Sequence, residues 1–148
     1  MAISEETPTL TDPDDAAWAA EQREAVEAYL QRQGCEHAGV SLEPRWQLPP
    51  YLAVWAVRSK AHPDAVGWWA ISGDVPTDYV SAARDIRDTS DVLAAFSREW
   101  LRYVEAMSRG EHVGVGEPQN TCELAPLLRD RARMLQVHSE QLRTASER

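Results

Sequence analysis

A chain of 148 residues with 43% hydrophobic and 26% charged residues has the size and composition of one globular domain rather than a disordered protein. Its longest apolar run, Tyr51–Val57, is too short to cross a bilayer. The formal net charge of −9 disfavours nucleic acid and anionic membranes as partners, because both would repel the chain at long range.

The N-terminal 13 residues are acidic and rich in proline and threonine. This composition is the opposite of a signal peptide and predicts a disordered tail over residues 1–13 in a cytoplasmic protein. The rest of the chain, residues 14–145, is predicted to form a single α+β domain.

Asp14 or Asp15 can cap a helix over residues 15–33, and Gly34 is suited to end it. One face of this helix is apolar and the opposite face is acidic, so we expect the acidic face to meet solvent. The apolar residues are Trp18, Val26, Tyr29 and Leu30, and the acidic residues are Glu21, Glu24 and Glu27.

Residues 35–50 contain three prolines and are predicted to form an irregular loop. The next two segments, Tyr51–Ser59 and Val66–Ser72, are rich in β-branched and aromatic residues and predict an antiparallel hairpin. Both faces of its first strand are apolar, so helices are expected to cover the hairpin on both sides. Alternation in the second strand separates Trp69 from a group on the other face, namely Val66, Trp68 and Ala70.

Three further helices are predicted. Thr77 can cap a short one over Asp78–Arg84, Asp88 or Ser90 opens a longer one that ends at Gly110, and the last spans about Leu124–Ala145. The fold is therefore predicted to be a small antiparallel hairpin packed by three or four helices. Its expected core residues are Trp18, Trp55, Trp69, Phe96, Trp100, Leu128 and Leu135.

The Ser72–Tyr79 turn, S-G-D-V-P-T-D-Y, is the best candidate site. Asp74 and Asp78 suit acid–base work or a polar ligand, and Trp68 and Tyr79 suit stacking walls, with Thr77 beside them. The alternative is that both carboxylates only cap turns and helices. No catalytic residue, metal ligand set or cofactor motif is predicted, because the four histidines are isolated and Cys35 and Cys122 lack the C-x-x-C spacing.

The hairpin and the turn together read P-Y-L-A-V-W-A-V, then G-W-W-A-I-S-G-D-V-P-T-D-Y. This string resembles an uncharacterised bacterial family of unknown function, and the similarity extends from Trp18 to about Leu135. The resemblance implies a cytosolic bacterial protein of this length and implies no activity or catalytic residue.

Two functions remain open. The acidic surface and the missing catalytic motifs favour a non-enzymatic protein-binding module, of the immunity or adaptor type, with a basic protein as partner. The alternative is a small-molecule-binding protein or a small enzyme that uses the Ser72–Tyr79 turn.

Overall fold

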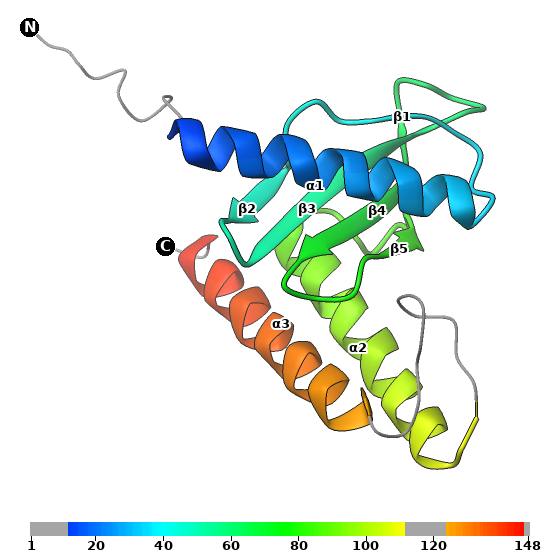
Figure 1. Cartoon of the computed structure of the whole chain (residues 1–148), viewed down its shortest axis with the longest axis vertical. Helices are drawn as coiled ribbons and strands as arrows, with labels where there is room; N and C mark the ends of the chain where they lie inside the picture. The colour runs from blue at the N-terminus through cyan, green and yellow to red at the C-terminus, as the bar shows by residue number, and fades with distance from the viewer. Residues whose placement is uncertain (1–11, 112–123, 147–148) are drawn as a thin grey trace, which may run out of the picture.

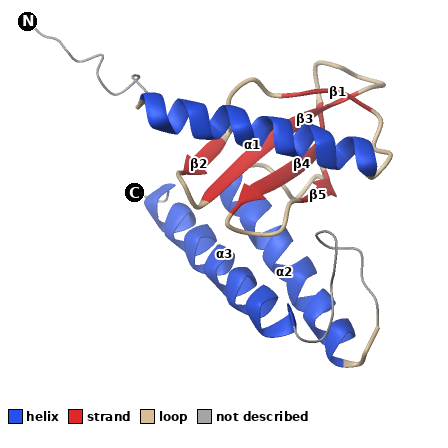
Figure 2. Cartoon of the chain, viewed as in Figure 1, coloured by secondary structure: helices blue, strands red, loops and turns tan. Residues whose placement is uncertain are grey.

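An antiparallel sheet of five strands separates helix α1 (Pro13–Arg32) from helices α2 (Thr89–Ser108) and α3 (Ala125–Ser146). Figures 1 and 2 show α1 alone on one face of the sheet and the α2–α3 pair on the other. This computed structural model describes residues 12–111 and 124–146. The predicted α+β class is confirmed, with three helices in the described part of the chain.

The centre of the sheet is the predicted hairpin, formed by β3 (Leu52–Ser59) and β4 (Val66–Gly73). All side chains from Leu52 to Val57 are buried, as expected for a strand covered on both sides. Their alternation divides them between two cores. Ala53, Trp55 and Val57 pack toward α1, and Leu52, Val54 and Ala56 pack toward α2 and α3.

The start of β4 corrects one predicted face. Arg58 pairs with Val66 while Val57 pairs with Trp68, so one extra residue is inserted in β4. Such a bulge reverses the alternation. Val66 therefore packs with Trp69 on the α2 side, whereas Trp68 and Ala70 share one face as predicted, and this face is the one toward α1.

The predicted irregular loop over residues 35–50 was wrong, because it contains two strands. Strand β1 (His37–Val40) pairs with the end of β3, and β2 (Trp46–Leu48) pairs with its beginning. Both lie on the side of β3 that β4 leaves open, so together they form one edge of the sheet (Figure 1). With three or four residues each, they are too short to show a period of two.

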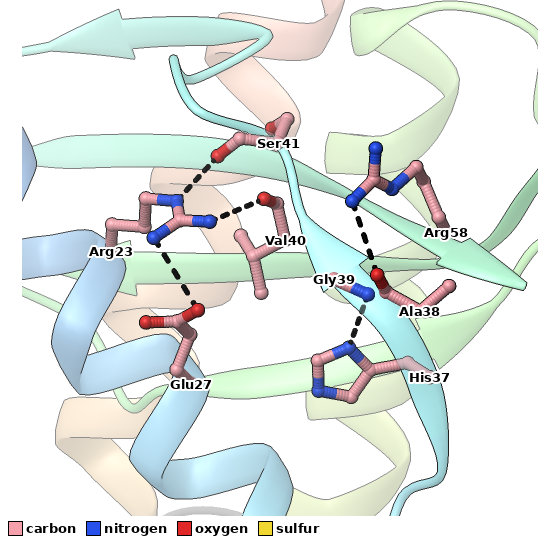
Figure 3. A network of polar contacts seen from close by, with 8 residues as sticks. All are labelled: Arg23, Glu27, His37, Ala38, Gly39, Val40, Ser41 and Arg58. Atoms are coloured by element: carbon pink, nitrogen blue, oxygen red, sulfur yellow. Dashed lines mark hydrogen bonds and ion pairs between the residues drawn. The ribbon is translucent and has the colours of Figure 1, made fainter. Parts of the chain in front are cut away.

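Arg23 fastens this edge to α1. Its guanidinium donates hydrogen bonds to the carbonyl oxygens of Val40 (2.8 Å) and Ser41 (2.9 Å) and makes an ion pair with Glu27 at 3.3 Å (Figure 3). One side chain of the helix therefore satisfies two backbone acceptors at the end of β1.

Two more contacts close the same edge. Arg58 donates to the carbonyl oxygen of Ala38 at 3.1 Å, and the amide of Gly39 donates to Nδ1 of His37 at 2.9 Å (Figure 3). Side chains thus occupy polar backbone groups along β1.

The opposite edge of the sheet is β5 (Asp78–Ser81), which pairs with β4. This corrects the predicted short helix over Asp78–Arg84 and its cap at Thr77. Tyr79 and Val80 are good strand formers, and pairing with β4 satisfies backbone groups that a single helical turn would leave open.

The helices begin and end close to the predicted residues. Asp12 caps α1, accepting a hydrogen bond from the amide of Asp14 at 2.7 Å, so the cap lies two residues before the nearer predicted one. Asp88 caps α2, and Gly34 and Gly110 end α1 and α2 with φ of 74° and 81°. The predicted tail lies outside the described residues, apart from Asp12 and Pro13.

Six of the seven predicted core residues are buried, and Trp18 is half-buried. Cys35 is a free thiol, and Cys122 lies outside the described residues. None of the helices described is both long and apolar enough to span a membrane.

Candidate functional site at the β5 edge

The connection from β4 to β5 is held by its own backbone. Gly73 has φ of 124°, and a side chain there would overlap the carbonyl group of Tyr51. This close approach lets the amide of Asp74 donate to the carbonyl oxygen of Tyr51 at 2.8 Å. The backbone amide of Asp74, within the candidate turn, is therefore paired within the fold.

Asp74 is clamped to helix α3. Its exposed carboxylate makes an ion pair with Arg131, with 3.2 Å between Oδ2 and Nη2, and Arg131 Nε also donates to the Asp74 carbonyl oxygen at 2.8 Å. The two contacts connect the β4–β5 turn to the C-terminal helix.

Asp78 is buried at the sheet edge, with 6% of its surface exposed. Its Oδ1 accepts from the backbone amide of Tyr79 at 2.8 Å, and its Oδ2 accepts from the indole nitrogen of Trp100 at 2.9 Å. Burial raises the pKa of Asp78 to about 6, although hydrogen bonds from Trp100, Tyr79 and Tyr29 act in the opposite direction and Glu99 adds repulsion. This carboxylate joins β5 to α2 and α1.

The two predicted aromatic walls lie on the α1 side of the sheet. Trp68 and Tyr79 both pack against the buried cluster beneath α1, and Tyr79 meets Tyr29 edge-on with 6.0 Å between ring centroids. Thr77 is half-buried in the chain that enters β5. The structure thus brings Trp68 and Tyr79 together on one face of the sheet. It does not bring the two carboxylates together, because Asp78 is bonded to Trp100 of α2 and Asp74 to Arg131 of α3.

The free side of β5 exposes backbone groups of two residues. The amide of Ala82 donates to the carbonyl oxygen of Gly67 at 2.9 Å, which fixes the alternation of the antiparallel ladder. Tyr79 and Ser81 accordingly point their backbone groups away from β4. Asp78 covers the amide of Tyr79, and the amide of Ser81 has no hydrogen-bond partner within residues 12–111 and 124–146.

An open groove of about 510 Å³ runs between this free side of β5 and helix α2. Its charged residues are two acids and two arginines, so its formal charge is zero. Its residues are Tyr79, Val80, Ser81, Asp85, Ile86, Ala95, Arg98, Glu99, Arg102 and Tyr103.

Sequence reasoning missed this groove. Its α2 residues share one face of the helix, since positions 95, 98, 99, 102 and 103 follow the spacing of three and four. That polar stripe was visible, but nothing in it showed that a strand rather than solvent lies beside it.

No group of three or more histidine, cysteine, aspartate or glutamate side chains is placed to hold a metal ion within the described parts of the chain. The groove contains pairs of opposite charge, and Glu99 is engaged by Arg102. Its chemistry suits recognition of a mixed polar surface.

Comparison with protein families gives one finding. A family model described as a domain of unknown function (DUF4826) matches residues 12–143. The chain belongs to this family. Comparison with curated proteins and with solved structures finds no match. The family thus includes α1, the whole sheet and nearly all of α3, and membership brings no activity with it.

Proposed function

We propose that this member of the family is a non-enzymatic protein-binding module of the bacterial cytosol, of the immunity or adaptor type, and that its partner is a basic protein. The observation that supports this most is the outer face of α1. Asp14, Glu21 and Glu24 are exposed there, and Arg23 is directed to the edge of the sheet rather than to these carboxylates.

The distribution of charge supports the same proposal. Residues 1–36 contain nine acids against two arginines. An acidic surface of this kind accelerates the approach of a basic partner and repels acidic competitors. The effect weakens with salt, because the screening length falls to about 8 Å at physiological ionic strength.

The polar groups of the Ser72–Tyr79 turn favour binding over catalysis. The Asp74 amide is paired with Tyr51, the Asp74 carboxylate with Arg131, and the Asp78 carboxylate with Trp100. Each pairing stabilises the fold and occupies a group that a reaction would require free.

A charge-matched pair of triple variants tests the proposal. One variant neutralises the α1 face by Asp14→Asn, Glu21→Gln and Glu24→Gln. The control neutralises three exposed acids elsewhere by Glu43→Gln, Asp64→Asn and Glu140→Gln, so both lose the same net charge.

The partner is first recovered by pull-down from the native host at low and at high salt, identified by mass spectrometry and purified. We expect a basic protein whose association with the α1 variant is about tenfold slower than with the parent, and nearly unchanged with the control. Recovery that does not depend on salt, or equal effects of the two variants, would contradict the proposal.

One observation favours the alternative of a small-molecule site. Asp78 has a pKa of about 6 and lies next to the groove, and perturbed carboxyl groups beside clefts are common in functional sites. Thermal shift across a metabolite library, with the parent and with Asp74→Asn plus Asp78→Asn, tests it. A ligand shift that a stably folded double variant loses supports a site, and loss of stability without any ligand response in the parent assigns both residues to the fold.

A further inference from the structure

We propose that the free side of β5, with the groove beside it, is a self-association surface on which a second copy of this chain adds its own β5 antiparallel to the first. The sheet would then continue through both copies about a two-fold axis. This inference does not depend on the proposed function, because it uses a different surface.

The backbone of β5 carries the first step. Ser81 presents an amide and Tyr79 presents a carbonyl group on the side away from β4. A free edge with such groups is a template for another strand. In contrast, arginines and a histidine occupy polar backbone groups of β1 at the other edge.

The pattern of these groups matches two-fold symmetry. Tyr79 and Ser81 lie one residue on either side of Val80, so antiparallel pairing centred on Val80 places Ser81 opposite the second copy's Tyr79. The Ser81 amide of each copy can donate to the Tyr79 carbonyl oxygen of the other. The Tyr79 amides stay with Asp78, so two reciprocal hydrogen bonds form.

The charge of the groove selects a second copy as the occupant. In a two-fold contact each patch meets itself, so a patch of one sign repels its copy, whereas a patch of mixed sign can bring opposite charges of the two copies together. The groove has two acids and two arginines in a chain of net charge −9. Asp85 and Arg98 make no ion pair with any described residue, and each copy presents one of these charges of each sign in the groove.

Apolar contact adds to these polar terms. Val80 and Ile86 are half-buried in the groove beside Tyr103. Covering them with the same residues of a second copy removes apolar surface from water. The α1 face, which is acidic, offers a second copy neither an unpaired strand nor opposite charge.

Ser81→Pro tests the proposal directly, because proline lacks the backbone amide that Ser81 points away from β4. The hydrogen bonds between β4 and β5 do not use this amide, so they are retained. The matched control is Ser81→Ala, which retains the amide. We expect sedimentation equilibrium from micromolar to millimolar concentration to show the parent and Ser81→Ala approaching twice the chain mass of 16.6 kDa, and Ser81→Pro remaining at one chain mass.

Hydrogen exchange provides a local readout. The Ser81 amide should exchange more slowly in the parent as protein concentration rises, whereas the Tyr79 amide, which Asp78 holds, should not change. If circular dichroism shows that Ser81→Pro is unfolded, the variant Arg98→Glu replaces it as the test of self-association. This substitution leaves the groove with a net negative charge, so the grooves of two copies repel each other. We expect association to weaken at least tenfold, and the loss to be greater at low salt than at high salt.

Three results would overturn the proposal. The first is a parent of one chain mass at every concentration. The second is association that neither a folded Ser81→Pro variant nor Arg98→Glu weakens. The third is a parent of one chain mass whose Ser81 amide becomes protected only when another protein is added, which would assign the edge to a different partner.

Discussion

The two edges of the sheet differ in how many of their backbone groups are hydrogen-bonded by side chains. At the β1 edge, side chains from α1, β3 and β1 itself reach backbone groups, and three polar side chains hold four of them. At the β5 edge, one buried carboxylate holds a single amide and leaves the neighbouring groups open. The β1 edge is closed to another strand, while the β5 edge is only partly closed.

The difference also concerns what each edge depends on. The β1 edge uses arginines, whose charge is permanent under ordinary conditions. The β5 edge uses Asp78, whose pKa of about 6 places its titration near physiological pH. The hydrogen bond by which Asp78 holds the Tyr79 amide at the β5 edge should therefore respond to pH. It should also respond to the loss of Trp100, which donates to the same carboxylate.

Among the variants at the two edges, Trp100→Ala should lower the free energy of unfolding most. Trp100 is fully buried and donates to Asp78, so its removal leaves both a cavity and a buried carboxylate with one donor fewer. We expect the free energy of unfolding, measured by urea denaturation at pH 7, to fall by about 3–5 kcal/mol.

Trp100→Phe is the closer comparison, because it retains a buried aromatic ring and loses the indole donor with only part of the buried volume. Its expected cost is about 1–3 kcal/mol. A melting temperature for Trp100→Ala within a couple of degrees of the parent would show that Trp100 supports neither the core nor the edge.

The pH dependence of stability should report Asp78 itself. Its folded pKa is about 6 against an ordinary 3.8, so the folded protein binds the proton more tightly than the unfolded chain. The resulting stability is fully present below about pH 4 and is lost as pH rises through about 6. At about 1.4 kcal/mol per pH unit, the loss amounts to about 3 kcal/mol.

Asp78→Asn removes this titration and retains an acceptor for the Tyr79 amide. Urea denaturation of parent and variant between pH 4 and pH 7 should therefore show the parent losing about 2 kcal/mol relative to the variant, which is most of the full loss. Two curves that run parallel across this range would mean that Asp78 does not titrate there.

The central elements were predictable because their signal is local. Two continuous apolar strands and three helices show their period within a short window, and capping residues and terminal glycines mark the limits of α1 and α2. The family resemblance added the extent of the domain. Even so, the bulge that turns Val66 to the other face arises from pairing with β3 and leaves no mark on the pattern.

The edges were not predictable for the opposite reason. Strands β1, β2 and β5 have only three or four residues, and each is stabilised by a partner elsewhere in the chain. The sequence marked Asp78 as a candidate site residue, but its donor Trp100 lies 22 positions away. Whether Asp78 serves a ligand stays a prediction, while its part in closing β5 follows from those contacts.

Arg23→Ala should open the β1 edge at a smaller cost. It leaves two carbonyl oxygens without a donor, at Val40 and Ser41, and we expect a loss of about 1–2 kcal/mol by urea denaturation. Glu27→Gln removes only the ion pair and should cost less than about 0.5 kcal/mol. Equal losses in the two variants would mean that the edge is not held by the carbonyl contacts.

The smallest loss of stability should come from substitution of Asp74. Such a small loss would show that Asp74 and Asp78 have different roles at the β5 edge. Asp74→Asn removes an exposed ion pair and retains the bond from Arg131 to the Asp74 carbonyl oxygen, so the expected cost is at most about 1 kcal/mol. Added salt should reduce even that, because screening weakens exposed pairs. Arg131→Ala should cost more, since it removes both contacts, and the double variant isolates the ion pair. A loss in Asp74→Asn as large as that of Trp100→Ala would instead make the β4–β5 turn, rather than the buried carboxylate of Asp78, the element on which the β5 edge depends.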